Sequence, residues 1–130
     1  MRYTTDFIIP AGTLSADPYT ESVLLAIGKL ERVLIRFRSG CHNKVFVTVR
    51  DGLQQILPGS PDLNLYGNDV IFDIPMQHYL TSPPYALILS GWSPDCLYDH
   101  CVTFWFDVVE GETEARQSTA ELLAHLGEIL

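Results

Sequence analysis

Positive charge is scarce in this sequence. Its 130 residues contain 8 Lys and Arg against 16 Asp and Glu, which gives a formal net charge of −8. Proteins that track a nucleic-acid backbone gain most of their affinity from Lys and Arg side chains that displace counterions from the phosphates. The charge balance therefore argues against nucleic acid as a direct partner.

Long apolar runs are also lacking. The chain opens with Met1, Arg2, Tyr3 and Thr4, without the apolar region of a secretory leader. The longest apolar runs, such as Val23 to Ile27, are far shorter than the roughly 20 residues of a membrane-spanning helix. We expect a chain that is neither exported nor inserted into a membrane.

Cysteine is too rare for a disulfide framework. The three cysteines, Cys41, Cys96 and Cys101, are an odd number in a chain without a leader, so reduced thiols in a protein assembled in a cytosol are the default. A chain of this length can bury about two-thirds of its unfolded surface without cross-links. The fold must therefore depend on one hydrophobic core.

Short segments rich in β-branched and aromatic residues make up most of the chain, separated by Pro, Gly, Asn, Asp and Ser. This pattern predicts an all-β domain, an antiparallel β-sandwich of Ig-like or jelly-roll-like type with about eight strands. Residues 11–109 would form the sandwich, and residues 1–10 an N-terminal arm or first strand. The candidate strands are Phe7–Ile9, Thr20–Ile27, Arg32–Arg38, Lys44–Arg50, Gln54–Leu57, Val70–Ile74, Tyr85–Ser90 and Cys101–Val109.

Two consecutive segments alternate clearly. Val33, Ile35 and Phe37 share one face of the first, and the valines at 45, 47 and 49 share one face of the second. The intervening residues 39–43 (SGCHN) hold the Gly and Asn of a tight connection. The pattern predicts a hairpin between the two strands.

Residues 110–130 have a different periodicity. Apolar side chains recur at helical spacing, and glutamates occupy the first turn. The segment predicts a short C-terminal amphipathic helix whose stripe packs on its own sandwich or on a neighbouring subunit. The stripe consists of Ala115, Thr119, Leu122, Leu126 and Ile129.

The stretch GWSPDCLYDHCVTFWFDVV gathers thiols, an imidazole and carboxylates. Cys96, Asp99, His100 and Cys101 are all possible zinc ligands, yet the Cys-x4-Cys spacing is wide for a zinc knuckle and only the remote Cys41–His42 pair could complete it. Strand parity places Val102, Phe104, Phe106 and Val108 in the core and Cys101, Thr103, Trp105 and Asp107 on the opposite face. A structured loop and core strand are the better interpretation, although a Cys96–Cys101 disulfide stays open.

No other pattern indicates chemistry. The four histidines lie outside any nucleophile signature, and acidic pairs such as Asp95 and Asp99 occur where loops need Asx turns. We expect no catalytic residues, no cofactor and no metal. The aromatic residues Tyr66, Trp92 and Tyr98 could stack on sugars, anchor an interface or cap the core.

Three stretches, one of which overlaps the stretch GWSPDCLYDHCVTFWFDVV, carry a resemblance to known proteins. They are IRFRSGC (Ile35 to Cys41), VTVRDGLQQILPGSP (Val47 to Pro61) and PPYALILSGWSPDCLYDHCVTFWFDV (Pro83 to Val108). The chain from Pro10 to Val109 resembles small β-sandwich proteins of tailed bacteriophages, which occur among virion structural components. The resemblance implies capsid decoration, cementing of the shell, or an accessory role at the portal or tail.

The sequence thus leads to a non-enzymatic virion structural protein, assembled in the host cytoplasm. Its expected partners are the major capsid protein or other virion proteins and its own copies in a homo-oligomer, with no nucleic acid and no membrane. The alternative is a carbohydrate- or receptor-binding module that uses exposed aromatic residues. The expected contact residues are Tyr3, Phe7, Ile9, Trp92, Tyr98, Leu122, Leu126 and Ile129.

Overall fold

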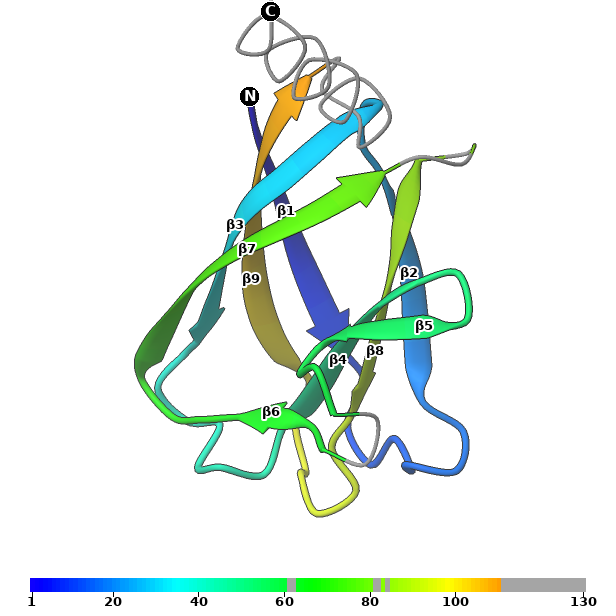
Figure 1. The fold of residues 1–130 in the computed structure, drawn as a ribbon. Coiled ribbons are helices and arrows are strands. Elements are labelled where there is room, and N and C mark those ends of the chain that lie inside the picture. Colours follow the sequence, from blue (N-terminus) through cyan, green and yellow to red (C-terminus); the bar gives the residue numbers. More distant parts are fainter. Residues whose placement is uncertain (61–62, 81–82, 84, 111–130) are drawn as a thin grey trace, which may run out of the picture.

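The computed structural model describes residues 1–60, 63–80, 83 and 85–110. These residues form two antiparallel β-sheets packed face to face (Figure 1). The predicted C-terminal helix lies outside the described residues. The strands are β1 (Arg2–Ile9), β2 (Tyr19–Leu24), β3 (Gly28–Phe37), β4 (Phe46–Asp51), β5 (Gln54–Leu57), β6 (Leu65–Tyr66), β7 (Val70–Leu80), β8 (Ala86–Trp92) and β9 (His100–Glu110).

The strand order is that of a jelly roll. The first sheet runs β1-β9-β3-β7 and the second β2-β8-β4-β5, with the two-residue β6 attached to β4. The chain changes sheet at most connections, and this is how a jelly roll winds two Greek keys around one core. The predicted antiparallel sandwich is confirmed, and the strand order favours its jelly-roll form.

The core consists of the inward faces of both sheets. Val33, Ile35 and Phe37 of β3 are fully buried, as the alternation predicted. The valines at 45, 47 and 49 and the four predicted inward residues of β9 are buried as well. Phe7 of β1 stacks on Tyr19 of β2 with ring centroids 5.5 Å apart, so aromatic contacts join the two sheets.

The predicted hairpin between β3 and β4 is wrong. β3 pairs with β7 and β9, whereas β4 pairs with β5, β6 and β8 in the other sheet. Residues 38–45 carry the chain across the core from one sheet to the other. Two alternating segments that bury one face each satisfy a hairpin and a cross-core pair equally well, so alternation alone could not distinguish them.

The first ten residues contribute a strand to the sandwich. All eight residues of β1 pair with β9, and the side chains of Phe7 and Ile9 are completely buried. The prediction that Phe7 and Ile9 contact a neighbouring protein is therefore wrong: their strand parity points them into the core. No helix among the described residues is long and apolar enough to cross a membrane.

Candidate binding surface at one end of the sandwich

Several connecting loops meet at the end of the sandwich opposite to the chain's N-terminus and the end of β9 (Figure 1). They are residues 10–18, 38–45, 67–69 and 93–99, and we call this surface the loop end. Ser93 joins two of the loops: its amide donates to the Thr13 carbonyl at 3.0 Å and its hydroxyl to the Pro10 carbonyl at 3.1 Å. The Ala11 amide donates to Asp99 Oδ1 at 2.8 Å. These long-range hydrogen bonds fix the loops relative to one another.

A second anchor holds the loop between β3 and β4. The amides of Gly40 and His42 both donate to Asn68 Oδ1, at 3.0 and 2.9 Å. His42 and Asn43 have positive φ, at 51° and 59°, a left-handed conformation that non-glycine residues adopt only where the surroundings enforce it. The side chain of Asn68 thus supplies the acceptor that this tight turn needs.

The loop between β8 and β9 presents two large side chains to solvent. Leu97 is 87% exposed and Tyr98 is 77% exposed. Leu14, in the loop between β1 and β2, is also exposed. Apolar groups at the tip of a loop with an anchored base are held in water, which is a feature of protein-binding surfaces.

A hollow of about 390 Å³ opens beside these residues. Its wall includes one cation, Lys44, one carboxylate, Asp95, and two imidazoles, His42 and His100. Its lining residues belong to the β3–β4 and β8–β9 connections of the loop end and to the first residue of β9. The lining residues are Gly40, Cys41, His42, Lys44, Asp95, Cys96, Leu97, Tyr98 and His100.

Two thiols lie at this hollow. Cys41 Sγ is 4.0 Å from His100 Nδ1, and Cys96 Sγ is 3.8 Å from the Lys44 carbonyl oxygen. Burial raises the pKa of both thiols above the usual value, so both stay protonated near neutral pH. A protonated, buried thiol is a poor nucleophile, and the contact of Cys41 with His100 is one of packing.

The proposed zinc ligands do not converge. Among the described residues no group of three or more His, Cys, Asp and Glu side chains could hold a metal ion. Asp99 accepts the Ala11 amide instead, a hydrogen bond between two loops that are far apart in the sequence. All three cysteines are free thiols in this structure.

Trp92 belongs to a separate row of aromatic residues on the outer face of the second sheet. It stacks on Phe46 with ring centroids 6.0 Å apart, and Phe46 meets Tyr66 edge-on at 5.8 Å. The three residues come from the adjacent strands β8, β4 and β6. Trp92 and Tyr98 therefore lie on different surfaces, a strand face and a loop tip, although only five residues separate them in sequence.

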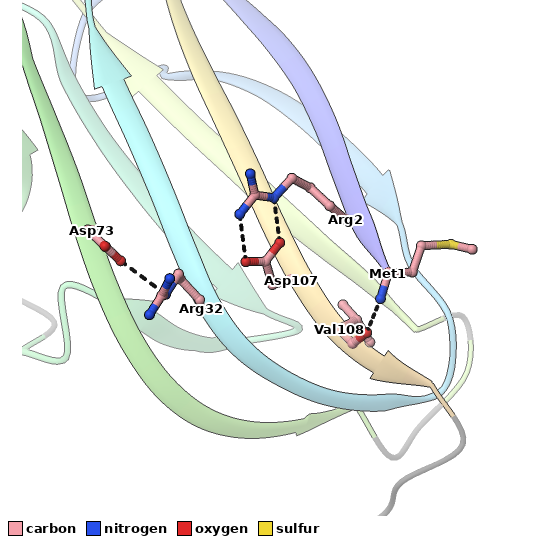
Figure 2. Close-up of polar contacts among 6 residues, drawn as sticks. All are labelled: Met1, Arg2, Arg32, Asp73, Asp107 and Val108. Atoms are coloured by element: carbon pink, nitrogen blue, oxygen red, sulfur yellow. Dashed lines mark hydrogen bonds and ion pairs between the residues drawn. The ribbon is translucent and has the colours of Figure 1, made fainter.

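The outer face of the first sheet carries a charged ladder (Figure 2). Arg2 donates to both carboxylate oxygens of Asp107, at 2.7 and 3.0 Å, and Arg32 lies 3.2 Å from Asp73. A hollow of about 470 Å³ lies beside this ladder, where the register of β3 shifts between Leu30 and Arg32. Because each of these carboxylates already has a basic partner, the ladder is a satisfied surface that water can solvate, and it does not indicate a ligand.

The structure places the remaining predicted contact residues as follows. Tyr3 packs partly against the core, and its hydroxyl donates to Glu110 Oε1 at 3.1 Å. Leu122, Leu126 and Ile129 lie outside the described residues. Leu97 was not among the predicted contact residues, although its place as an apolar residue inside the polar stretch PDCLYDH was a signal for it.

No family model matches the chain, and no curated protein matches it. Similarity is found to a solved structure of exo-β-1,3-galactanase from Phanerochaete chrysosporium with galactose, at a TM-score of 0.37 and 16% identity over 82% of this chain. A variant of that enzyme with β-1,3-galactotriose gives a TM-score of 0.32 and 15% identity over 80% of this chain. In both cases the chain spans 27% of the galactanase chain. The similarity is too low to bear on function.

Proposed function

We propose that this protein is a non-enzymatic accessory of a tailed-bacteriophage virion, which attaches to capsid or other virion proteins and to its own copies through the loop end. The observation that carries the proposal is the exposure of Leu97 and Tyr98 on a loop with a fixed base. The virion assignment comes from the resemblance of residues 10–109, and the jelly roll is a fold used by viral capsid domains.

The energetics of such a surface suit repeated attachment. Burying one leucine or aromatic side chain stabilises a contact by about 1.5–3 kcal/mol. Because the base of the loop is already ordered, little conformational entropy is lost when a partner covers the tip. Single contacts of this size are weak, and many copies on a symmetric particle bind by avidity.

The first test is the copy number of the polypeptide in purified particles from its source, measured by mass spectrometry against the major shell protein. A ratio that follows the capsomer lattice supports decoration or cementing, and a few copies per particle support a portal or tail position. Absence from particles contradicts the proposal.

A second test locates the contact. Leu97→Asp should reduce rebinding to particles that lack the protein by at least about 10-fold, the equivalent of about 1.4 kcal/mol. Leu53→Asp is the matched control, because Leu53 is equally apolar and fully exposed but lies at the β4–β5 turn, away from the loop end. Equal losses in both variants would show that the loop end is not the contact.

The aromatic row favours a second candidate function, a carbohydrate-binding module. Tyr66, Phe46 and Trp92 form a continuous aromatic strip across three strands, and sugar rings stack on such side chains. A glycan array should then give saturable binding that Tyr66→Ala weakens, since Tyr66 is the most exposed ring of the row. An array without any bound glycan would rule this function out.

A further inference from the structure

The hollow at the loop end and the C-terminal segment have complementary chemistry. Among the residues that line the hollow, Leu97 and Tyr98 are apolar and exposed, and Lys44 is basic. Residues 111–130 contain four glutamates and one arginine, a net charge of −3, and their sequence predicts a helix with Leu122, Leu126 and Ile129 along one stripe. Because Lys44 and Asp95 leave the lining without net charge, the apolar stripe of an amphipathic helix is the feature that suits Leu97 and Tyr98.

The geometry decides which copy of the segment can reach it. Strand β9 starts at His100, beside the hollow, and ends at Glu110 at the opposite end of the sandwich (Figure 1). The ten residue-to-residue steps from His100 to Glu110 span about 33 Å at roughly 3.3 Å per residue. A helix that begins after Glu110 rises about 1.5 Å per residue, so it would place Leu122 and Leu126 only about 18 and 24 Å away, short of the hollow of its own chain.

We infer that residues 111–130 of one copy dock into the loop-end hollow of the next copy, so that the protein self-associates head to tail. This inference rests on the proposed role of the loop end as a protein-binding surface, and it names the occupant. The two contacting surfaces lie at opposite ends of the chain, so the contact is heterologous. A heterologous contact builds rings where the rotation between copies closes, and open chains where it does not.

The contact requires no change in the sandwich. The loops that frame the hollow are already held by the hydrogen bonds of Ser93 and Asn68. The apolar stripe would cover Leu97 and Tyr98, while glutamates on the flanks of the segment face Lys44. Salt should therefore change association only modestly, because apolar burial carries most of the contact.

Sedimentation velocity over a dilution series of the full-length chain tests the inference with two variants. Leu122→Glu with Leu126→Glu places charge on the apolar stripe of the segment and leaves the hollow unaltered. Leu97→Glu places charge on the wall of the hollow and leaves the segment unaltered. We expect the unaltered protein to form species larger than a dimer as concentration rises, and each variant alone to stay monomeric. Leu53→Glu, which places the same charge away from the loop end, should associate like the unaltered protein.

The decisive sample is an equimolar mixture of the two variants. It contains one intact hollow and one intact segment per pair, so it should form a heterodimer and nothing larger. A symmetric interface predicts no such rescue, and a mixture that stays monomeric overturns the inference. An unaltered protein that remains monomeric at concentrations about 100-fold above those at which it binds particles also overturns the inference.

Failure of this inference is distinguishable from failure of the proposed function. A monomeric protein that still binds particles through Leu97 would mean that a capsid protein occupies the loop end, and head-to-tail docking would be wrong while the function stands. A protein that associates head to tail but is absent from particles would support the docking and contradict the proposed function.

Discussion

Gly91 shows how a single residue sets the distance between the two sheets. A Cβ atom at this position would lie 2.5 Å from Ile9 Cδ1 and 2.8 Å from Phe7 Cε2. Both neighbours are completely buried and have no space to move aside. The close approach of β1 to β8 therefore depends on the missing side chain.

We expect Gly91→Ala to lower the free energy of unfolding by about 1–3 kcal/mol, the usual cost of overpacking a core. Urea denaturation monitored by tryptophan fluorescence measures the change. Gly59→Ala is the control, because a Cβ at Gly59 would meet nothing within 4 Å. Equal stability of the two variants would contradict the tight packing at Gly91.

Asp107 gives a prediction for pH dependence. The two hydrogen bonds and the positive charge of Arg2 hold the pKa of the Asp107 carboxyl below its usual value. A carboxyl whose pKa is lower in the folded state stabilises the fold above its unfolded pKa of about 3.9, and the stabilisation is lost as the pH falls through the folded value. The effect is small because the pair is partly exposed.

Arg2→Gln should therefore lower the urea midpoint slightly at neutral pH, and the difference from the unaltered protein should shrink as the pH falls below about 4 and disappear below the lowered pKa of Asp107. Arg36→Gln is the control, since among the described residues no ion pair involves Arg36. A difference between Arg2→Gln and the unaltered protein that persists in acid would show that Arg2 acts by packing and not through the charge of Asp107.

At the scale of elements, one polar contact connects the two sheets at their open edge. His78 of β7 lies 2.6 Å from Asp51 Oδ2 at the end of β4, and both side chains are largely shielded from solvent. β7 belongs to the first sheet and β4 to the second. The contact therefore links two strands that share no backbone hydrogen bonds.

A double-mutant cycle with His78→Ala and Asp51→Ala should give a coupling free energy of about 0.5–1.5 kcal/mol, because the pair is short and partly buried. The same cycle on Arg32 and Asp73, an ion pair in which both side chains are about half exposed, should give about 0–0.5 kcal/mol. A larger coupling for the exposed pair would show that shielding does not govern these contacts.

At the scale of the whole molecule, the docking of residues 111–130 onto a neighbour predicts that the sandwich does not need them. The free energy of unfolding of the Leu122→Glu, Leu126→Glu double variant, measured at a concentration where the protein is monomeric, should equal that of the unaltered protein within about 0.5 kcal/mol. If the segment packs on its own sandwich, the two substitutions should instead lower the free energy of unfolding by about 2–5 kcal/mol per buried leucine. Urea denaturation separates the two arrangements.

The distribution of charge is also a property of the whole molecule. Four of the eight basic residues, Arg2, Arg32, Arg36 and Arg38, project from the outer face of the first sheet by strand parity. Asp6, Asp73 and Asp107 lie on the same face, so these four positive and three negative charges sum to +1. The remaining residues carry −9, which gives the chain its total of −8. Identical copies therefore carry the same negative charge and repel one another over most of their surface, and specific association must occur at a local apolar contact.

The sequence by itself determined the local properties of this protein. Segments rich in β-branched and aromatic residues identified eight of the nine strands of the described residues, and alternation identified the buried faces of β3, β4 and β9, because the period of two is a property of each strand alone. It missed β6, which has only two residues and no room for a pattern. It left open whether Tyr98 is exposed or caps the core, and the structure shows the side chain of Tyr98 to be 77% exposed.

Only the tertiary structure decided which strands pair and which loops meet. The jelly-roll order, the assignment of β3 and β4 to different sheets, and the burial of Phe7 and Ile9 all follow from pairings between residues far apart in the chain. The loop end exists for the same reason: Ser93 bonds to Pro10, and Asn68 bonds to Gly40 and His42, across long stretches of sequence. Contacts over such sequence separations leave no local periodicity, since their free energy comes from closing the core and not from any single segment.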